Sequence, residues 1–361
     1  MDASRWRNAA CDFGCYLLAR CVLLRRMRAT SLLVVGLFAC GPGGNDHPGG
    51  DDDIIDDAPH APFDVPVGID AAPQSITIKT VFVIPMENKA NSQIYGNTAD
   101  APFINSLLAS AAHATKFGDE LPSLPSEPHY VWMEAGTNAF NDRTFTNDDD
   151  ASASNSTSST AHLVTQLNTA GVPWMSYQEG ITSNTCPIAS AGHYAAKHNP
   201  FVFFQDVVGS PPSATAPGCA SHHKSYESFA ADLANGLTGF VFITPNECND
   251  MHGAITCPSF IFDAQNIKAG DTWLSQELPR IITYTQTHQD AVIFITWDEG
   301  DSTNVVPFLA IGHYVKAGFT STATYSHSSM LKSIEELLHV PVLPSVTAAN
   351  DFSDLFVPGV F

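Results

Sequence analysis

A run of apolar and β-branched residues that ends in two adjacent carboxylates constrains this chain more than any other feature. Residues 292–297 read Val-Ile-Phe-Ile-Thr-Trp, and Asp298 and Glu299 follow directly. A continuous apolar run of this length is typical of a strand buried on both faces of a parallel sheet. Ligands of α/β sheets bind at the carboxyl ends of such strands, and neighbouring carboxylates repel each other unless a cation lies beside them. The run predicts a metal site at a strand end. The alternatives are a solvated turn and a purely structural calcium site.

The rest of the chain alternates between strand-like and helix-like segments. Strands are expected at 76–84, 173–177, 240–244, 292–297 and 308–311. Helices are expected at 102–112, 131–135, 162–170, 229–235, 271–286 and 328–338. This alternation predicts an α/β fold with a mainly parallel central sheet flanked by helices. No repeat and no second boundary interrupts it, so one domain is expected from residue 76 to residue 361.

The N-terminal region carries the signs of export. Arg25, Arg26 and Arg28 precede an apolar run at 31–38, which ends at a small residue. A basic segment, a short apolar segment and a small residue describe a secretory signal, and the run is too short to span a bilayer. Residues 1–39 are therefore expected to be a signal region.

The end of the signal and the segment after it point to the cell envelope. Met27 would begin a signal of ordinary length, which would leave residues 1–26 upstream of a misassigned start. Residues 37–40, Leu-Phe-Ala-Cys, resemble a bacterial lipobox with Cys40 as the lipidated residue. Residues 40–75 are rich in Gly, Pro and Asp, which predicts a disordered tether. The protein is expected to be an envelope lipoprotein in membrane contact through Cys40 or, if the cut is a plain one, secreted.

Charge and cysteine content limit the partners and the compartment. The formal net charge of −21 argues against nucleic acid as a partner. Four cysteines fall in the expected domain, and an even number in an exported domain predicts two disulfides. The pairing between sequence neighbours joins Cys186 with Cys219 and Cys248 with Cys257. Two other pairings of the four cysteines stay open. No Cys-x-x-Cys spacing occurs, which disfavours a zinc cluster.

Polar side chains follow three of the predicted strands, and a further histidine precedes the last helix. These residues are Glu87 and Asn88, Asp250 and His252, Asp298 and Glu299, and His327. Carboxylate, amide and imidazole groups at one sheet edge suit one or two divalent cations, whose identity these residue types do not fix. Ser126 lies at a predicted helix start, where backbone donors and the helix dipole favour a phosphate oxygen. The alternative for Ser126 is an ordinary helix cap.

Seven short motifs occur in an order that resembles a known family. They are Met-Glu-Asn at 86–88, Pro-Ser-x-Pro-x-Tyr at 125–130, Lys-His-Asn-Pro at 197–200, Thr-Pro-Asn-x-x-Asn-Asp-Met-His at 244–252, Gly-Asp-x-Trp-Leu at 270–274, Trp-Asp-Glu at 297–299 and Tyr-Ser-His-x-Ser at 325–329. Together they resemble the bacterial phosphoesterase family of secreted acid phosphatases and phospholipases C. That family belongs to the alkaline-phosphatase-like superfamily. The resemblance covers nearly all of residues 80–340.

The resemblance implies a role for each matching residue. The implied metal ligands are Glu87, Asn88, Ser126, Asp298 and Glu299. Ser126 matches the nucleophile, and the family commonly has His where this chain has Leu124 or Pro125, so Ser123 is the alternative nucleophile. Five further positions match family residues that hold a second metal, bind the phosphate or protonate the leaving group. They are His198, Asn199, Asp250, His252 and His327.

These observations predict a hydrolase acting on phosphoric ester bonds. The leading hypothesis is a metal-dependent phosphomonoesterase, similar to acid phosphatases and able to act on phospholipid headgroups, that works through a phosphoserine. The first alternative is a phospholipase C that cleaves a phosphodiester. A metal-binding lipoprotein without catalysis is the second.

Overall fold

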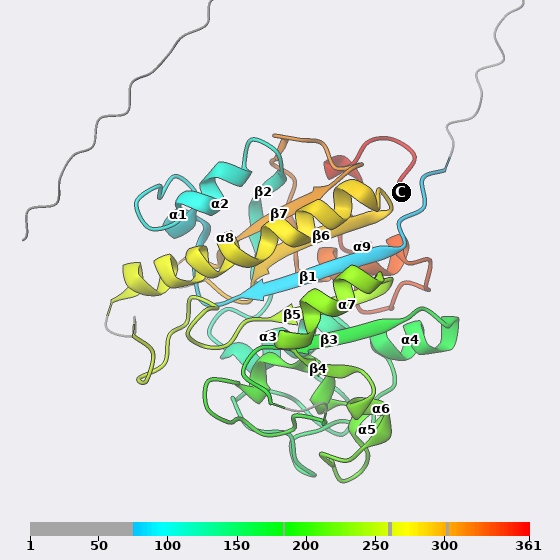
Figure 1. The fold of residues 1–361 in the computed structure, drawn as a ribbon. Helices are drawn as coiled ribbons and strands as arrows, with labels where there is room; N and C mark the ends of the chain where they lie inside the picture. Colours follow the sequence, from blue (N-terminus) through cyan, green and yellow to red (C-terminus); the bar gives the residue numbers. More distant parts are fainter. Residues whose placement is uncertain (1–74, 183–184, 259–261, 301–302) are drawn as a thin grey trace, which may run out of the picture. The chain divides into compact units, whose positions relative to one another are not determined.

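The structure is a computed structural model that describes residues 75–182, 185–258, 262–300 and 303–361 (Figure 1). All of them belong to one compact unit, Val67–Phe361. The predicted signal region, the candidate lipid site at Cys40 and the predicted tether up to residue 74 lie outside the described residues. Within the described ranges, no helix combines the length and apolar character needed to cross a membrane.

Strands and helices alternate along the chain in the described residues. The strands are β1 (Thr80–Met86), β2 (Ala112–Gly118), β3 (Trp174–Gln178), β4 (His223–Ser225), β5 (Gly239–Thr244), β6 (Ala291–Trp297), β7 (Val305–Gly312), β8 (Thr320–Ser321) and β9 (Tyr325–Ser326). The α-helices are α1 (Asn91–Ile94), α2 (Pro102–Leu107), α3 (Ser126–Ala135), α4 (Leu163–Ala170), α5 (Gln205–Val208), α6 (Pro217–Ala220), α7 (Phe229–Asn235), α8 (Asp263–Thr287) and α9 (His327–Leu337). Short 3₁₀ turns lie at Ala196–His198, Pro200–Phe203, Tyr226–Ser228 and Ser353–Leu355.

The described strands form one sheet in the order β4-β3-β5-β1-β6-β7-β2-β8, with β9 paired to β2. β1 lies between β5 and β6 and is parallel to both. β7 is antiparallel to β6 and to β2, whereas the remaining pairs are parallel. The predicted α/β class with a mainly parallel sheet is therefore confirmed.

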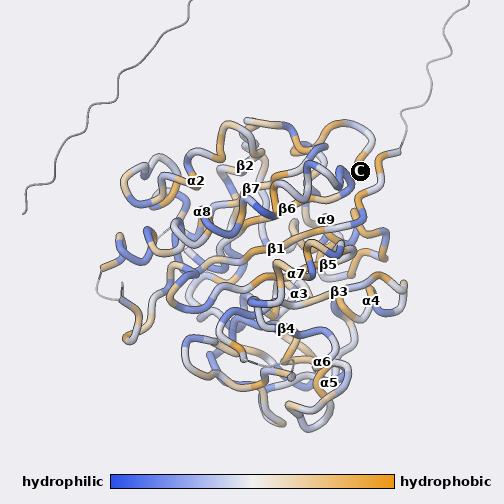
Figure 2. Tube along the Cα trace, in the orientation of Figure 1, coloured by the Kyte–Doolittle hydropathy of each residue, from blue (hydrophilic) through white to orange (hydrophobic). Residues whose placement is uncertain are grey.

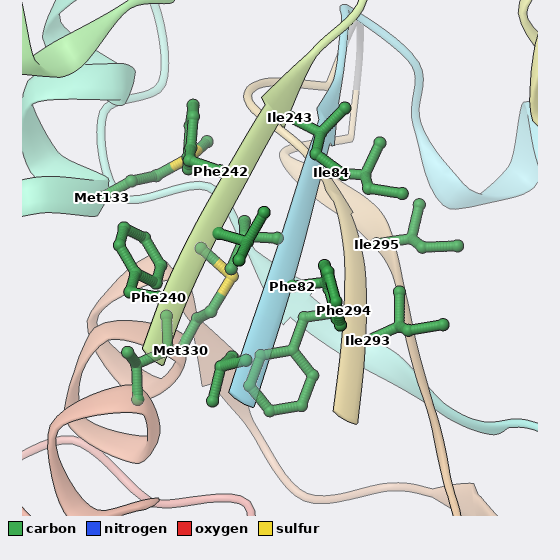
Figure 3. Packing of buried hydrophobic residues seen from close by; sticks show 14 of the residues in the cluster. Phe82, Ile84, Met133, Phe240, Phe242, Ile243, Ile293, Phe294, Ile295 and Met330 are labelled. Carbon is green, nitrogen blue, oxygen red and sulfur yellow. The ribbon is translucent and has the colours of Figure 1, made fainter. Parts of the chain in front are cut away.

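The two faces of the sheet are covered by different helices. Phe82 of β1 makes edge contacts with Phe229 of α7 and Tyr284 of α8. Phe242 of β5 lies on the opposite face, where its ring contacts Tyr130 of α3. Successive side chains of a strand point to opposite faces, so a strand covered on both faces must be apolar throughout. Figure 3 shows buried hydrophobic side chains of β1, β5 and β6 from close by, and in Figure 2 hydrophobic segments run through the middle of the molecule.

The strand expected at 76–84 is observed at Thr80–Met86, the strand expected at 308–311 is longer, and three predicted helices differ from the observed ones by five or more residues. The helix expected at 102–112 ends at Leu107, and residues Ala112–Gly118 form β2 instead. Burial alternates along most of β2, which is the pattern of a half-covered strand. The helix expected at 131–135 already begins at Ser126, because the prolines at its start lie where no N–H is needed. The helix expected at 271–286 begins at Asp263.

Candidate active site

The two central parallel strands deliver Glu87 with Asn88, and Asp298 with Glu299, to the same edge of the sheet. Met86 and Trp297 are register partners at the ends of β1 and β6. The next residues are Glu87 and Asp298, and both are fully buried. The Asn88 N–H donates to Asp298 Oδ1 at 3.0 Å, which ties Asp298 to the first strand end. The register of the sheet therefore fixes where these side chains meet.

A third buried carboxylate comes from the loop after β5. The Glu87 N–H donates to the Asp250 carbonyl at 2.8 Å, so the loop is hydrogen-bonded to the end of β1. The Cys248–Cys257 disulfide closes this loop. Helix α8 passes so close to it that a β-carbon at Gly270 would stand 2.4 Å from Met251 Cγ. The disulfide closes the loop, and the glycine allows α8 to pack closely against it. Together they keep Asp250 against the strand ends.

Helix α3 brings a hydroxyl group to these acidic residues. Ser126 is the first residue of α3, and its Oγ donates to Glu87 Oε2 at 3.1 Å. The same Oγ lies 3.5 Å from Glu299 Oε1. One turn further on, the Tyr130 hydroxyl donates to Glu87 Oε1 at 2.5 Å. Residues four apart share a helix face, so a single face of α3 contacts Glu87 twice.

His198 joins the cluster without forming good hydrogen bonds. Its Nε2 is 3.3 Å from Glu87 Oε1, and its Nδ1 is 3.5 Å from Asp250 Oδ2. Both contacts are too bent for hydrogen bonds, so neither ring nitrogen has a partner in the described part of the chain. Glu87, His198 and Asp250 each offer one ligand atom, and these three atoms lie within 4.8 Å of one another. This spacing suits coordination of one ion.

The atoms without partners are of the types that bind divalent cations. Buried polar atoms normally have a hydrogen-bond partner, because an unpaired one costs free energy. Among the described residues, the unpaired buried atoms at this edge include Asn88 Oδ1, both His198 nitrogens, Asp250 Oδ2, Asp298 Oδ2 and His327 Nδ1. Carboxylate and amide oxygens with imidazole nitrogens form a mixed ligand set that several divalent metals accept. The residues present therefore fit a metal ion.

Burial and neighbouring charge raise the pKa values of the carboxyls in this cluster. The pKa of Glu87 is raised well above its usual value by burial and by the charges of Asp298 and Asp250. Burial and the charge of Glu247 raise the pKa of Asp250 in the same way. Burial and Asp298 raise the pKa of Glu299 to about 7. A cation among these groups would favour their ionised forms and offset this cost.

Two buried histidines of the site are kept neutral. Burial lowers the pKa of His198 well below its usual value, and the charges of Lys197 and His252 lower it further. Burial and then the charge of His129 lower the pKa of His327. A neutral imidazole keeps a nitrogen lone pair for a metal or a proton.

His129 differs from these two histidines because an ion pair holds it. Its Nδ1 lies 3.2 Å from Asp119 Oδ1, and its Nε2 lies 4.0 Å from Glu299 Oε2. Burial works to lower the pKa of His129, but the Asp119 hydrogen bond and the charge of Asp298 outweigh it and raise the value to about 9. His129 is therefore a cation at the rim of the acidic cluster.

The backbone is strained close to the candidate ligands. Three residues other than glycine have positive φ angles here, Asn88 at 51°, Ser123 at 84° and Met251 at 83°. Each is within three residues of Glu87, Ser126 or Asp250 in the sequence. Strain of this kind costs free energy and is commonly concentrated at functional sites.

The other predicted site residues have different surroundings. His252 is partly exposed, and its ring lies 6.3 Å from that of His198. His327 begins α9, and its Nε2 lies 2.8 Å from the Trp297 carbonyl, just before Asp298. Ser123, the alternative nucleophile, is exposed, whereas Ser126 is buried.

The structure does not bring the Asn199 amide to this cluster. Asn199 Nδ2 donates to the Tyr194 hydroxyl at 3.1 Å, and its Oδ1 lies 3.1 Å from His223 Nε2. The amide therefore belongs to a separate buried hydrogen-bond network, although Asn199 follows His198 directly in the sequence.

Three residues of the site were not predicted from the sequence. Tyr130 and His129 lie four and three residues after Ser126, so helical spacing alone could have placed them on its face. Lys197 adjoins His198. Burial works to lower its pKa, but the charge of Glu87 and the hydrogen bond and charge of Asp148 together outweigh burial and raise the pKa.

Both disulfides connect the cysteines that are neighbours in sequence, Cys186–Cys219 and Cys248–Cys257, as expected. Cys248, Cys257 and His193 also lie close enough to hold an ion, but the disulfide removes both thiolates. Within the described residues, the candidate metal site is therefore the one around Glu87.

Comparison with known proteins agrees with this geometry. The sequence model of the Phosphoesterase family matches residues 120–341. A phosphatidylinositol-3-phosphatase of Mycobacterium tuberculosis is 30% identical over 283 residues, which cover 78% of this chain and 83% of that protein. A phosphate-repressible acid phosphatase of Penicillium chrysogenum is 29% identical over 234 residues, which cover 61% of this chain and 51% of that protein. The chain thus spans about half the length of this fungal relative.

Solved structures resemble the fold at low sequence identity. A protein of the alkaline phosphatase superfamily from Vibrio parahaemolyticus has a TM-score of 0.50 and 10% identity, and the match covers 77% of this chain and 71% of that chain. A likeness at this identity concerns the arrangement of helices and strands alone.

Proposed function

Because the chain belongs to the Phosphoesterase family and is a hydrolase acting on phosphoric ester bonds, we propose that it is a metal-dependent phosphomonoesterase that works through a phosphoserine at Ser126. One observation carries this proposal. The Ser126 hydroxyl lies between Glu87 and Glu299, at 3.1 Å and 3.5 Å, in a cluster of buried ligand atoms without partners.

The metal ligands proposed from the sequence are Glu87, Asn88, Asp298 and Glu299, together with the Ser126 hydroxyl. His198 and Asp250 extend the ligand set toward the loop after β5. When bound, a divalent cation lowers the pKa of a coordinated hydroxyl and neutralises charge on a phosphate oxygen. The ligands do not distinguish one ion from two, nor one metal from another.

We assign the nucleophilic attack to Ser126. Its hydroxyl proton points to Glu87 Oε2, so the proton leaves Oγ along an existing hydrogen bond. The Oγ–P bond forms while the bond from phosphorus to the leaving alcohol oxygen breaks. The Tyr130 hydroxyl holds the other oxygen of the Glu87 carboxylate during this step.

The leaving alcohol oxygen needs a proton, and His252 is the best placed histidine to supply it. It is partly exposed, whereas His198 and His327 are buried. Its Nδ1 lies 2.7 Å from the Gly253 carbonyl, so Nε2 is the ring nitrogen to which we assign the proton transfer. Water then attacks phosphorus, the Oγ–P bond breaks, and the serine hydroxyl and free phosphate are released.

The substrate is proposed to be a monoester. The relatives are named as a phosphatidylinositol-3-phosphatase and acid phosphatases, all of which remove a terminal phosphate. A phospholipid headgroup phosphate is therefore a candidate substrate. Hydrolysis of p-nitrophenyl phosphate but not of p-nitrophenylphosphorylcholine is the expected result, and the reverse preference would favour a phospholipase C.

Replacement of the nucleophile tests the mechanism directly. Ser126→Ala should lower kcat by at least about 10³-fold, because the covalent route is lost, while the fold is retained. Ser123→Ala is the matched control, since Ser123 is exposed and lies in the same turn. Full activity of Ser126→Ala together with an inactive Ser123→Ala would assign the nucleophile to Ser123.

We also propose that the domain from residue 76 to 361 is exported and lipid-anchored at Cys40. Two disulfides are typical of exported proteins, and the acid phosphatase relatives fit that compartment. Cys40→Ser should abolish incorporation of labelled fatty acid and release the protein from the membrane fraction. Equal labelling of both forms would exclude anchoring at this residue.

A further inference from the structure

An ion pair stands beside the proposed nucleophile. Lys197 lies in the 3₁₀ turn Ala196–His198, directly before His198. Its Nζ donates to Asp148 Oδ2 at 2.7 Å, and the lysine side chain is 18% exposed. The charge of Glu87 raises the pKa of Lys197 against the effect of burial, so the ammonium group lies within electrostatic range of the acidic cluster.

The other oxygen of the same carboxylate binds the start of α3. The Glu127 N–H donates to Asp148 Oδ1 at 3.0 Å. Pro125 and Pro128 have no N–H, so Ser126 and Glu127 supply the free N–H groups of the first turn. The Asp148 carboxylate thus takes up an ammonium group and a helix N-terminal N–H, a donor set that proteins use for phosphate.

We propose that Lys197 and the Glu127 N–H form the binding site for two oxygens of the substrate phosphate, and that the Asp148 carboxylate occupies this site until substrate displaces it. The inference rests on Ser126 being the nucleophile. Glu127 follows Ser126 directly, so an anion bound by its N–H lies next to the serine hydroxyl. Asp148 is then an internal competitor of the substrate.

The surroundings of Asp148 allow its side chain to leave while the loop stays in place. The Asp149 N–H donates to Glu127 Oε2 at 2.8 Å, and Asp150 Oδ1 accepts from the Ser190 N–H at 2.9 Å. These contacts hold the neighbouring backbone independently of Asp148. The Asp148 side chain is 30% exposed, so water can solvate the displaced carboxylate.

Charge explains why a competing carboxylate would be useful here. A phosphate monoester is a dianion, and it must approach Glu87, Asp298 and Glu299. In the phosphate-free protein, Asp148 balances the ammonium group of Lys197. Exchange of one anion for another avoids leaving the lysine unpaired, which is costly for a mostly buried charge.

Inorganic phosphate is the probe that tests this site. Its affinity is measured by calorimetry in the metal-loaded protein and by competitive inhibition of p-nitrophenyl phosphate hydrolysis. Asp148→Asn should bind phosphate about tenfold more tightly, because a charge-assisted contact no longer competes for the donors. Asp148→Ser should give the same shift. Lys197→Gln should weaken phosphate binding about tenfold or more, because it removes the ammonium donor.

Two matched variants serve as controls. Asp150→Asn removes a carboxylate from the same loop, and Lys224→Gln breaks the Lys224–Asp232 ion pair, whose 2.8 Å distance resembles that of Lys197 and Asp148. Neither should change phosphate affinity by more than about twofold.

The outcomes separate this inference from the proposed mechanism. Weaker or unchanged phosphate binding in Asp148→Asn would show that Asp148 only orients Lys197, and the inference would be wrong. Unchanged binding in Lys197→Gln would remove the lysine from the site. If Ser126→Ala remained fully active, the phosphoserine would fail, yet calorimetry would still report on Lys197 and Asp148.

Discussion

Helix α3 connects two clusters, each with two carboxylates around a buried histidine, that contain the same groups in different states. At its start, Ser126 and Tyr130 bind Glu87, which lies next to His198 and Asp250. Near its end, Glu134 Oε1 lies 2.9 Å from His162 Nδ1, and Asp206 Oδ1 lies 3.0 Å from His162 Nε2. Each histidine therefore stands between two carboxylates. We call these the Glu87 cluster and the Glu134 cluster.

The two clusters differ in whether their hydrogen bonds are satisfied. Both nitrogens of His162 have partners, and Glu134 Oε1 also accepts from the Val164 N–H at 2.8 Å. Neither nitrogen of His198 has a partner among the described residues. Burial opposes the charged form in both histidines. The partners of His162 outweigh it and raise the pKa to about 9, whereas the pKa of His198 is lowered well below its usual value.

The difference shows how one set of residue types can serve stability or chemistry. In the Glu134 cluster the geometry completes an ion pair, so the residues hold elements together. In the Glu87 cluster the geometry leaves lone pairs facing one another, an arrangement that is costly until a cation or substrate completes it. Residue type alone does not separate the two cases, but hydrogen-bond geometry does.

The largest expected effect is on catalysis in the Glu87 cluster. Glu87→Gln should lower kcat/KM by at least about 10³-fold, because a metal ligand and the proton acceptor of Ser126 are lost. The free energy of unfolding of the metal-free protein should change little, since burial and the neighbouring carboxylates already disfavour the charged form of Glu87 there. Steady-state kinetics and denaturant unfolding measure the two quantities. A variant with high activity and low stability would reverse the assignment.

The matching change in the Glu134 cluster should act on stability. Glu134→Gln should lower the free energy of unfolding by about 3 kcal/mol, because His162 loses one partner of a buried ion pair. Activity per folded molecule should stay within about twofold. Urea unfolding, with activity measured well below the transition, checks both. A large loss of kcat in the folded variant would mean that the two clusters are coupled through α3.

Metal binding should stabilise the protein through the Glu87 cluster alone. At a cation concentration about 100 times the Kd, stabilisation should reach about 2.7 kcal/mol, and a chelator should remove it together with activity. In Asp298→Asn this metal-dependent shift of Tm should shrink, whereas Glu134→Gln should keep it in full. Activity that survives exhaustive chelation would contradict metal dependence.

The smallest expected effect is the pH dependence of stability. His162 has a folded-state pKa of about 9 against an ordinary value of 6.5, so its stabilising contribution is complete below pH 6.5 and is lost as the pH rises through 9. Between pH 7 and pH 9 the free energy of unfolding should fall by about 1 kcal/mol per pH unit from this group. His162→Gln should flatten the slope. His129, also raised to about 9, remains in both proteins, so the difference isolates His162. An identical slope in both would refute the assignment.

The sequence predicted the centre of the sheet well because its strands are apolar on both faces. The runs at 240–244 and 292–297 lie within β5 and β6, and register places their carboxyl ends at one edge. Candidate ligands directly after those strands could therefore be predicted to meet. The disulfide pairing followed sequence proximity. β2 was missed because Ala112–Gly118 is only half covered and because no glycine or proline in the sequence separates it from the helical residues before it.

The rest of the site depends on contacts that no local pattern encodes. Tyr130 binds Glu87 from 43 residues away, and Lys197 meets Asp148 across 49 residues. Asn199 shows the opposite case. Its position in a motif suggested that it belongs to the active site, whereas its amide is hydrogen-bonded to Tyr194 and His223 in a separate network. Motif position indicates which loop approaches a site, whereas the turn geometry decides which side chain enters it.

The glycine of α8 that meets the Asp250 loop limits how this protein can evolve. Exposed positions on the same helix, such as Thr272 and Gln276, have side chains in solvent and should tolerate exchange. At Gly270, a single added methyl group would collide with Met251 Cγ at 2.4 Å and approach the Asn249 carbonyl to 3.0 Å. An alanine at this position would displace the loop that carries Asp250. The proposed site would then lose its alignment although none of its own residues had changed. Tolerance to mutation at this buried position of the helix is therefore decided by its contact with the loop that carries a site residue.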